Sequence, residues 1–358
     1  MISNQVLQNT LEGLKEISRT EFCIIDTDGK TLASTYSDFE IQPQDVQAFV
    51  ESQAASQLVK GYQYFKVCDD YQLEYILVAH GEDEDTYMPE LPVEVKNGDY
   101  HYAYHTISDF KVGNYNARNY NARNYTVCYS AENHGPVWVA APLHNCYVTK
   151  SGNRSYSQDP DVPAGIQPAS KSLASPYNKG HMLGNRERSR TAVMRRQVCY
   201  YTNIAPQHGG TFNTGGGAWN NLEDLIDTYW DSTESANVGD TLYVVVGAYY
   251  KTWTDSYGNT ASPKKAAFGG QQAGVPTMFY YAMLRTKNAK SGKSVLRCSR
   301  EELQCAAFVM SHAMQKGHKP SRSDMRSVAE VERLSGFQFF TNVPNAPKDT
   351  YNPSDWGL

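Results

Sequence analysis

Several features that mark other classes of protein are missing from this chain of 358 residues. No apolar run approaches the ~20 residues that a membrane-spanning helix needs, so we expect no membrane partner. The first residues, Met1 to Gln5, show no basic region followed by an apolar block. No signal peptide is therefore visible and the N-terminus looks cytoplasmic, but the localisation stays open.

The seven cysteines form no Cys-x-x-Cys pair, which argues against a structural zinc site. Cys298 and Cys305 are close enough in sequence to bridge a turn, and ordinary buried thiols are an equal alternative. The redox compartment stays open on this evidence.

Acidic residues are scarce in the later part of the chain. Through residue 92, acidic residues outnumber basic residues by 17 to 5, whereas the remainder holds 28 basic and 21 acidic residues. The segment from Lys171 to Arg196 alone holds seven basic residues and one acid, Glu187. This asymmetry indicates a polyanionic partner for the later part, and a chance difference between two solvated surfaces is the alternative.

The length and the charge asymmetry suggest two domains. The early part has an apolar helical pattern, a hairpin around an Asp-Gly turn, a further helix and a second hairpin, at residues 2–19, 22–33, 44–53 and 62–78. This order is typical of a small α/β sensor domain. The segment Ile25 to Ala33 resembles the PAS/GAF-like module of sugar-diacid regulators, which implies a small-molecule ligand.

A linker is predicted between the domains, because residues 82–85 are four successive acids and residues 89–92 contain two prolines. We place the sensor-type domain at residues 1–88, the linker at 89–110 and the second domain at 111–358. The aromatic and basic tandem repeat at residues 115–124 could stack on bases, although we favour a strand or loop that leads into the second domain.

The second domain has the pattern of an α+β fold. Apolar, β-rich runs predict strands at residues 125–129, 137–142, 198–204, 241–247 and 277–284. Residues 220–232 have the apolar spacing of a helix.

The most informative motif is Asn178-Lys179-Gly180-His181, followed by Asn203-Ile204-Ala205-Pro206-Gln207 and by a segment from Asn213 to Glu223. Together with Asn153-Arg154 and with Val331 to Phe340, these segments resemble the DNA/RNA non-specific endonucleases over roughly residues 93 to 345. The resemblance implies an α+β fold with a ββα-metal finger and a central antiparallel sheet. It also implies metal-dependent hydrolysis of phosphodiester bonds in DNA and RNA.

The residue types suit that chemistry. A neutral imidazole can accept a proton from water near pH 7, so we assign the general base to His181. Asn213 is the predicted metal ligand, because Mg²⁺ prefers oxygen ligands and keeps several waters; Mn²⁺ is a possible substitute. By resemblance, Arg154 holds the scissile phosphate and Glu223 orients metal-bound waters. Lys179 and Asn203 are predicted to contact the substrate.

Three departures from the family pattern leave alternatives open. Asn178 and Lys179 stand where the family has Asp and Arg, and Asp227 stands where relatives carry a substrate-contacting Arg. Extra glycines at residues 215–217 could shift the start of the helix. An inactive nuclease domain that still binds nucleic acid is therefore the alternative function, and a nuclease gated by residues 1–88 is a further one.

Overall fold

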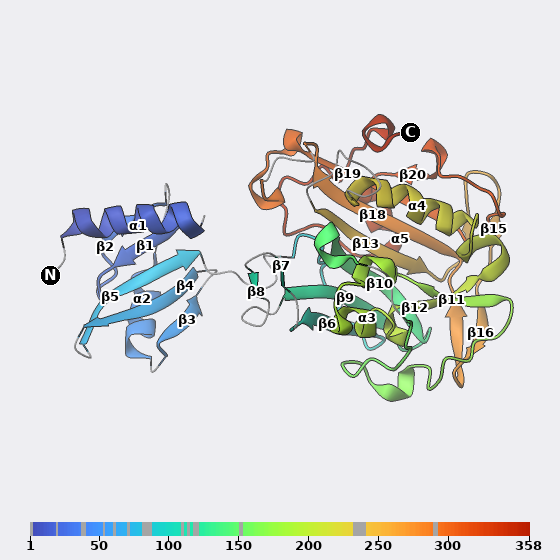
Figure 1. Ribbon diagram of the computed structural model, residues 1–358, viewed down its shortest axis with the longest axis horizontal. Helices are drawn as coiled ribbons and strands as arrows, with labels where there is room; N and C mark the ends of the chain where they lie inside the picture. Colours follow the sequence, from blue (N-terminus) through green and yellow to red (C-terminus); the bar gives the residue numbers. More distant parts are fainter. Residues whose placement is uncertain are drawn as a thin grey trace. The chain divides into compact units, whose positions relative to one another are not determined.

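The computed structural model describes residues 3–18, 21–36, 41–52, 54–59, 62–69, 72–80, 88–108, 111–112, 115–116, 122–149, 153–231, 241–288 and 293–358. The chain divides into two compact units, unit 1 from Met1 to Met88 and unit 2 from Pro89 to Leu358 (Figure 1). None of the helices in these ranges is long and apolar enough to cross a bilayer.

Unit 1 is a small antiparallel sheet with a helix on each face. Its elements in chain order are α1 (Asn4–Ser18), β1 (Phe22–Ile25), β2 (Thr31–Ser34), α2 (Pro43–Glu51), β3 (Ser56–Val59), β4 (Tyr62–Asp69) and β5 (Gln72–His80). The strand order is β2-β1-β5-β4-β3. Leu7 and Leu11 of α1 pack against Ile24, whereas Val46 and Phe49 of α2 pack on the other face.

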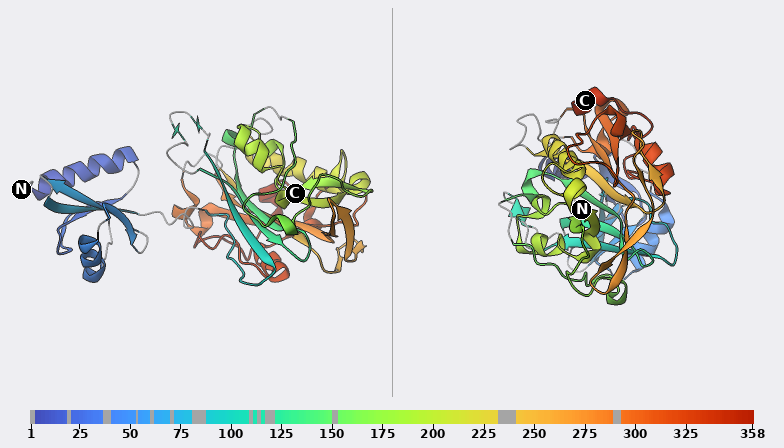
Figure 2. Two further views of the ribbon diagram at one scale, coloured as in Figure 1. Left: turned by 90° about the horizontal axis from the view of Figure 1, so that it is seen from below. Right: turned by 90° about the vertical axis from the view of Figure 1, so that its right-hand side faces the viewer.

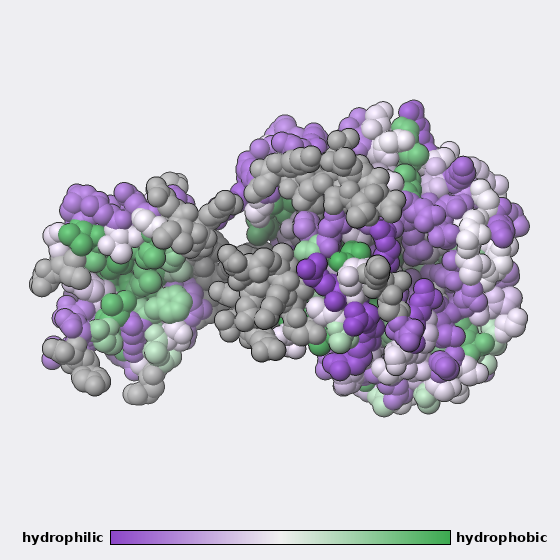
Figure 3. All heavy atoms as spheres, viewed as in Figure 1, coloured by the Kyte–Doolittle hydropathy of each residue, from purple (hydrophilic) through white to green (hydrophobic). Residues whose placement is uncertain are grey.

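The two predicted helices and the two predicted hairpins of unit 1 are thus confirmed, and β3 was not foreseen. Figure 3 shows an apolar area on unit 1 beside α1, whereas the drawn face of unit 2 is largely hydrophilic. The sensor identity of unit 1 stays a prediction.

Unit 2 contains a seven-stranded antiparallel sheet in the order β20-β19-β18-β13-β10-β9-β6. These strands are β6 (Tyr100–Ile107), β9 (Ala122–Ser130), β10 (Gly135–Leu143), β13 (Leu242–Tyr249), β18 (Met278–Thr286), β19 (Leu303–Ser311) and β20 (Met325–Arg326). The α+β class with a central antiparallel sheet is confirmed. The predicted linker is wrong over Tyr100–Ile107, because that segment forms an edge strand of the sheet.

The two longer helices of unit 2, α4 (Ala218–Trp230) and α5 (Val328–Ser335), lie on opposite faces of this sheet (Figures 1 and 2). The main core forms where Trp219 and Ile226 of α4 meet Phe279 and Tyr281 of β18. Burial of each such side chain contributes roughly 1.5–3 kcal/mol. The core therefore fixes α4 firmly against the sheet.

Smaller elements complete unit 2: β7 (Lys111–Val112), β8 (Tyr115–Asn116), β11 (Tyr177–His181), α3 (Ala192–Gln197), β12 (Ile204–His208), β14 (Trp253–Thr254), β15 (Thr260–Ala261), β16 (Lys264–Phe268) and β17 (Gln271–Val275). Of the tandem repeat, residues 117–121 lie outside the described ranges. The strand predicted at residues 198–204 is wrong: a 3-10 turn, Tyr201–Asn203, precedes β12.

Candidate functional site

The site is built on the antiparallel pair β11–β12, in which Asn178 lies opposite Gln207 and His181 lies opposite Ile204. Side chains alternate along a strand, so β11 has two faces. We call the side of Tyr177, Lys179 and His181 the aromatic face and the side of Asn178 and Gly180 the amide face.

His181 is the central residue of the aromatic face. Its side chain is nearly buried, its ring centroid lies 5.8 Å from that of Tyr156, and its Nε2 lies 3.8 Å from the Cys199 Sγ. Burial, reinforced by the charge of Arg154, lowers the pKa of His181 to about 3. The imidazole is therefore neutral at physiological pH, as a general base must be.

Two cations flank His181. The Lys179 ammonium lies 5.4 Å from the centre of the Tyr156 ring. Arg154 is exposed, and it acts electrostatically on both Tyr156 and His181. Neither cation forms an ion pair with a carboxylate within the described part of the chain. The Tyr156 ring thus links the three residues, which together form an uncompensated positive site beside a neutral base.

The amide face holds Asn213. The Asn178 Nδ2 donates to the Asn213 Oδ1 at 3.2 Å, and the Asn213 Nδ2 donates to the Gln207 Oε1 at 2.6 Å. A Cβ atom at Gly180 would stand 2.2 Å from the Gln207 Cδ. The glycine is therefore required to make room for Gln207.

Asn213 ends a π-helical turn, Gly209–Asn213, whose Thr211 N–H is accepted by the His208 Nδ1 at 3.3 Å. The extra glycines follow, and α4 begins at Ala218. The turn contacts both strands of the β11–β12 pair and α4, so it connects the helix to the pair.

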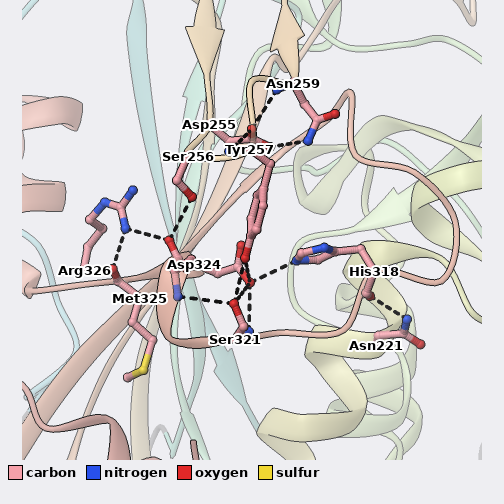
Figure 4. Close-up of polar contacts among 11 residues, drawn as sticks. Asn221, Asp255, Ser256, Tyr257, Asn259, His318, Ser321, Asp324, Met325 and Arg326 are labelled. Carbon is pink, nitrogen blue, oxygen red and sulfur yellow. Dashed lines mark hydrogen bonds and ion pairs between the residues drawn. The ribbon is translucent and has the colours of Figure 1, made fainter.

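A loop that follows β19 holds the start of α4 in place, and Figure 4 shows its residue His318 beside Asn221 of α4. The Gly317 N–H donates to the Gly216 carbonyl at 2.7 Å, and the Asn221 Nδ2 donates to the His318 carbonyl at 2.7 Å. The His318 ring is itself 3.0 Å from the Asp324 carboxylate. The start of α4 is thus fixed on two sides.

A β-strand pair, a turn that carries the amide side chain of Asn213 and a following helix together form a ββα arrangement. The family model of the DNA/RNA non-specific endonucleases matches residues 104–346. The chain belongs to this family.

Similar proteins include "Nuclease 1, mitochondrial" of Schizosaccharomyces pombe, which is 24% identical over 199 residues. That match covers 54% of this chain and 57% of the relative, so the chain spans little more than half of the relative's length. A chain in the solved structure "Crystal structure of the EndoG/EndoGI complex: Mechanism of EndoG inhibition" has a TM-score of 0.47 at 21% identity, over 67% of this chain and 88% of that chain.

The family helix α4 presents Glu223 toward other acids. The Trp219 indole N–H donates to the Glu223 carboxylate at 3.1 Å. Burial, followed by the charges of Glu187 and Asp227, raises the pKa of Glu223 well above its usual range. Burial likewise raises the pKa of Glu187 to about 7. A nearby cation would favour the ionised form of this acidic group.

Asp227, which stands in place of a family arginine, forms an ion pair with Arg186 at 2.6 Å. Arg186 also contacts Asp231. The positive charge at this place is that of Arg186, which lies in the segment after β11. The carboxylates of Asp227 and Asp231 neutralise it. Nothing in the sequence pattern links residue 186 to residue 227, so this pairing was missed.

Asn203 does not reach a bound strand. It is fully buried, its Oδ1 accepts the Leu183 N–H at 2.9 Å, and its Nδ2 donates to the carbonyls of Leu183 and Val198. The substrate contact predicted for Asn203 is therefore replaced by a structural role, because its amide fixes the chain that follows His181.

Two places offer possible metal ligands. On the amide face, the Asn213 Oδ1 accepts one hydrogen bond and keeps a second lone pair, which fits a hard cation that is otherwise bound by water. Elsewhere, His105, Asp159 and Asp161 lie close enough to share an ion. That group already forms its own contacts, with the His105 Nε2 at 2.9 Å from Asp159 and its Nδ1 at 3.5 Å from Asp161.

Proposed function

We propose that unit 2 is a metal-dependent endonuclease that hydrolyses phosphodiester bonds of DNA and RNA with little sequence preference. The observation that carries this proposal is the neutral, nearly buried His181 beside the uncompensated charges of Arg154 and Lys179. Family membership supports the same reaction class.

The proposed roles follow from the two faces. His181 accepts the proton of the attacking water. Arg154 holds two phosphate oxygens through its planar guanidinium, and Lys179 adds a point charge. Contacts of this kind fall on phosphates, which position a strand without specifying its bases.

Asn213 would hold the divalent ion, with Mg²⁺ as the expected metal and Mn²⁺ as a substitute. When bound, such an ion neutralises the charge that develops on the leaving oxygen. Glu223 would orient water near Asn213, and Asn178 and Gln207 keep the amide of Asn213 in position.

Supercoiled plasmid and a structured RNA, each with Mg²⁺ or chelator, test the proposal. Loss of a general base typically costs about 10²–10⁴-fold in rate, so His181→Ala should leave almost no metal-dependent cleavage. His101→Ala, on the edge strand β6, is the matched control and should cut normally. Near-normal cutting by purified His181→Ala contradicts the assignment of the base.

The alternative is a nucleic-acid-binding protein with an inactive nuclease domain. It is favoured by Asp227, which by resemblance stands where relatives carry a substrate-contacting arginine and which here neutralises Arg186 together with Asp231. Salt-sensitive binding without cleavage in Mg²⁺, Mn²⁺ or Ca²⁺ would support it.

Unit 1 lies outside the family match, which begins at residue 104. We propose, from the order of its elements, that it is a PAS-like sensor for a small molecule. Comparison of cleavage by residues 89–358 and by the whole chain tests whether unit 1 regulates the nuclease. Equal rates with and without unit 1, across a panel of small metabolites, would contradict that role.

A further inference from the structure

A cavity of about 280 Å³ opens at the end of the β11–β12 pair, one position beyond Asn178 and Gln207. Tyr177 and His208 line it from β11 and β12, Lys264 lines it from β16, and His312 lines it from the segment after β19. No carboxylate is among the described residues that line this cavity. Its volume is near the lower end of the ~300–1,000 Å³ of small-molecule sites.

The His312 imidazole is held rigidly in this cavity. It is almost fully buried, and its ring centroid lies 4.8 Å from that of Phe212. Its Nδ1 donates to the Pro276 carbonyl at 2.6 Å and its Nε2 accepts the His208 N–H at 2.8 Å. Burial lowers the pKa of His312 to about 4, so this part of the cavity wall is uncharged at neutral pH.

The other walls supply an aromatic surface and two donors. The Tyr177 ring is half-buried, 6.3 Å from the rings of both His208 and His312. The His208 Nδ1 accepts the Thr211 N–H, so its proton is on Nε2, which has no hydrogen-bond partner among the described residues. The Lys264 ammonium lies 5.9 Å from the centre of the Tyr177 ring and has no carboxylate partner there.

We propose that this cavity is a nucleotide subsite, in which a base of the substrate strand stacks on Tyr177 and its phosphate contacts Lys264 and His208. The inference rests on the proposed function and deepens it. The chemistry matches because an aromatic wall can stack on any base. A cation and a hydrogen-bond donor with no neighbouring carboxylate favour an anion, here the phosphate attached to that base. A paired base is already stacked on both sides, so the subsite favours unpaired strands.

Binding without cleavage isolates the subsite. In the His181→Ala background with chelator, fluorescence anisotropy measures the affinity for a 3′-labelled, 5′-phosphorylated single-stranded tetradeoxyadenylate. Tyr177→Ala should weaken binding by roughly 5- to 100-fold, and Tyr177→Phe should restore it, because only the ring is needed.

Lys264→Gln should weaken binding and reduce the salt dependence by about one ion. Lys265→Gln, on the same strand with the opposite side-chain direction, should leave both unchanged.

The outcomes separate the two proposals. Unchanged affinity in Tyr177→Ala, or an equal loss in Lys264→Gln and Lys265→Gln, contradicts the subsite even if the wild type cuts plasmid normally. Absence of cleavage by the wild type contradicts the proposed function, whatever the oligonucleotide does. In a parallel series, the oligonucleotide carries one abasic nucleotide. The His181→Ala parent should bind this strand more weakly than the intact strand. Tyr177→Ala should bind both strands equally, since it has no ring for the base to contact.

Discussion

The two faces of β11 are built from different interactions. On the amide face, Asn178 and Gln207 hold Asn213 through hydrogen bonds of 3.2 and 2.6 Å. On the aromatic face, the rings and charges around Lys179 and His181 are spaced by 5.4 to 5.8 Å. Directional bonds fix one geometry, whereas ring contacts and bare charges tolerate movement of a partner.

This difference suggests a division of labour. The amide face suits an ion that must stay in one position, and the aromatic face suits a substrate strand that binds and leaves. Variants on the amide face should therefore change the metal requirement, and variants on the aromatic face should change the use of substrate.

Among the variants that test this comparison, the largest effect is expected for Gly180→Ala, which would break the amide face directly. The new Cβ would displace Gln207, so metal-dependent cleavage should fall roughly 10- to 100-fold. Overpacking of this kind should also destabilise unit 2 by about 1–3 kcal/mol. Thermal denaturation and plasmid cleavage measure the two losses, and Gly165→Ala, which meets open space, should show neither.

Asn178→Ala should produce a smaller and more selective change. The Asn213 Oδ1 loses its donor, so the Mg²⁺ concentration for half-maximal cleavage should rise about 10-fold. The rate at saturating Mg²⁺ should stay within a few-fold of wild type. An unchanged metal requirement would show that Asn178 does not support the ligand.

Lys179→Gln tests the aromatic face in the same way. The loss of one phosphate contact should raise KM several-fold and reduce the salt dependence of KM by about one ion, with little change in the Mg²⁺ requirement. Initial rates over a range of salt concentrations measure this. A change in kcat with an unchanged KM would contradict the assignment of Lys179 to phosphate binding.

The smallest effect on activity is expected for Glu187→Gln, which tests the buried carboxyl of Glu187. Burial raises the pKa of Glu187 to about 7, above its ordinary value of 4.5. The contribution of protonated Glu187 to stability should therefore be fully present below pH 4.5 and be lost as pH rises through 7. Glu187→Gln should gain up to about 3 kcal/mol at pH 8 and little at pH 4. Tm curves at the two pH values decide this, and equal gains would contradict a buried carboxyl.

Local patterns in the sequence predicted much of the fold, including the two hairpins of unit 1 and the helix α4. The edge strand β6 was missed although Tyr100 to Ile107 alternates between buried and exposed positions, because the neighbouring prolines suggested a linker. Residues 198–204 are apolar and β-branched, yet the Asn203 side chain cross-links them to Leu183 and forces a turn. Such tertiary bonds override a local propensity.

The motif predicted roles for His181, Asn213 and Glu223, but it did not show how these side chains are supported. The role of Gln207 depends on the space that Gly180 leaves, and the cavity beside Tyr177 needs Lys264 and His312 from distant segments. These relations arise only when the sheet brings the segments together.

A crossed titration tests the division between the faces most directly. Half-saturating Mg²⁺ and KM for a single-stranded DNA are measured for the wild type, Gln207→Ala, Lys179→Gln and the double variant. The account predicts that Gln207→Ala raises only the Mg²⁺ requirement, that Lys179→Gln raises only KM, and that the double variant adds the two effects. A shift of both parameters by either single variant would contradict it.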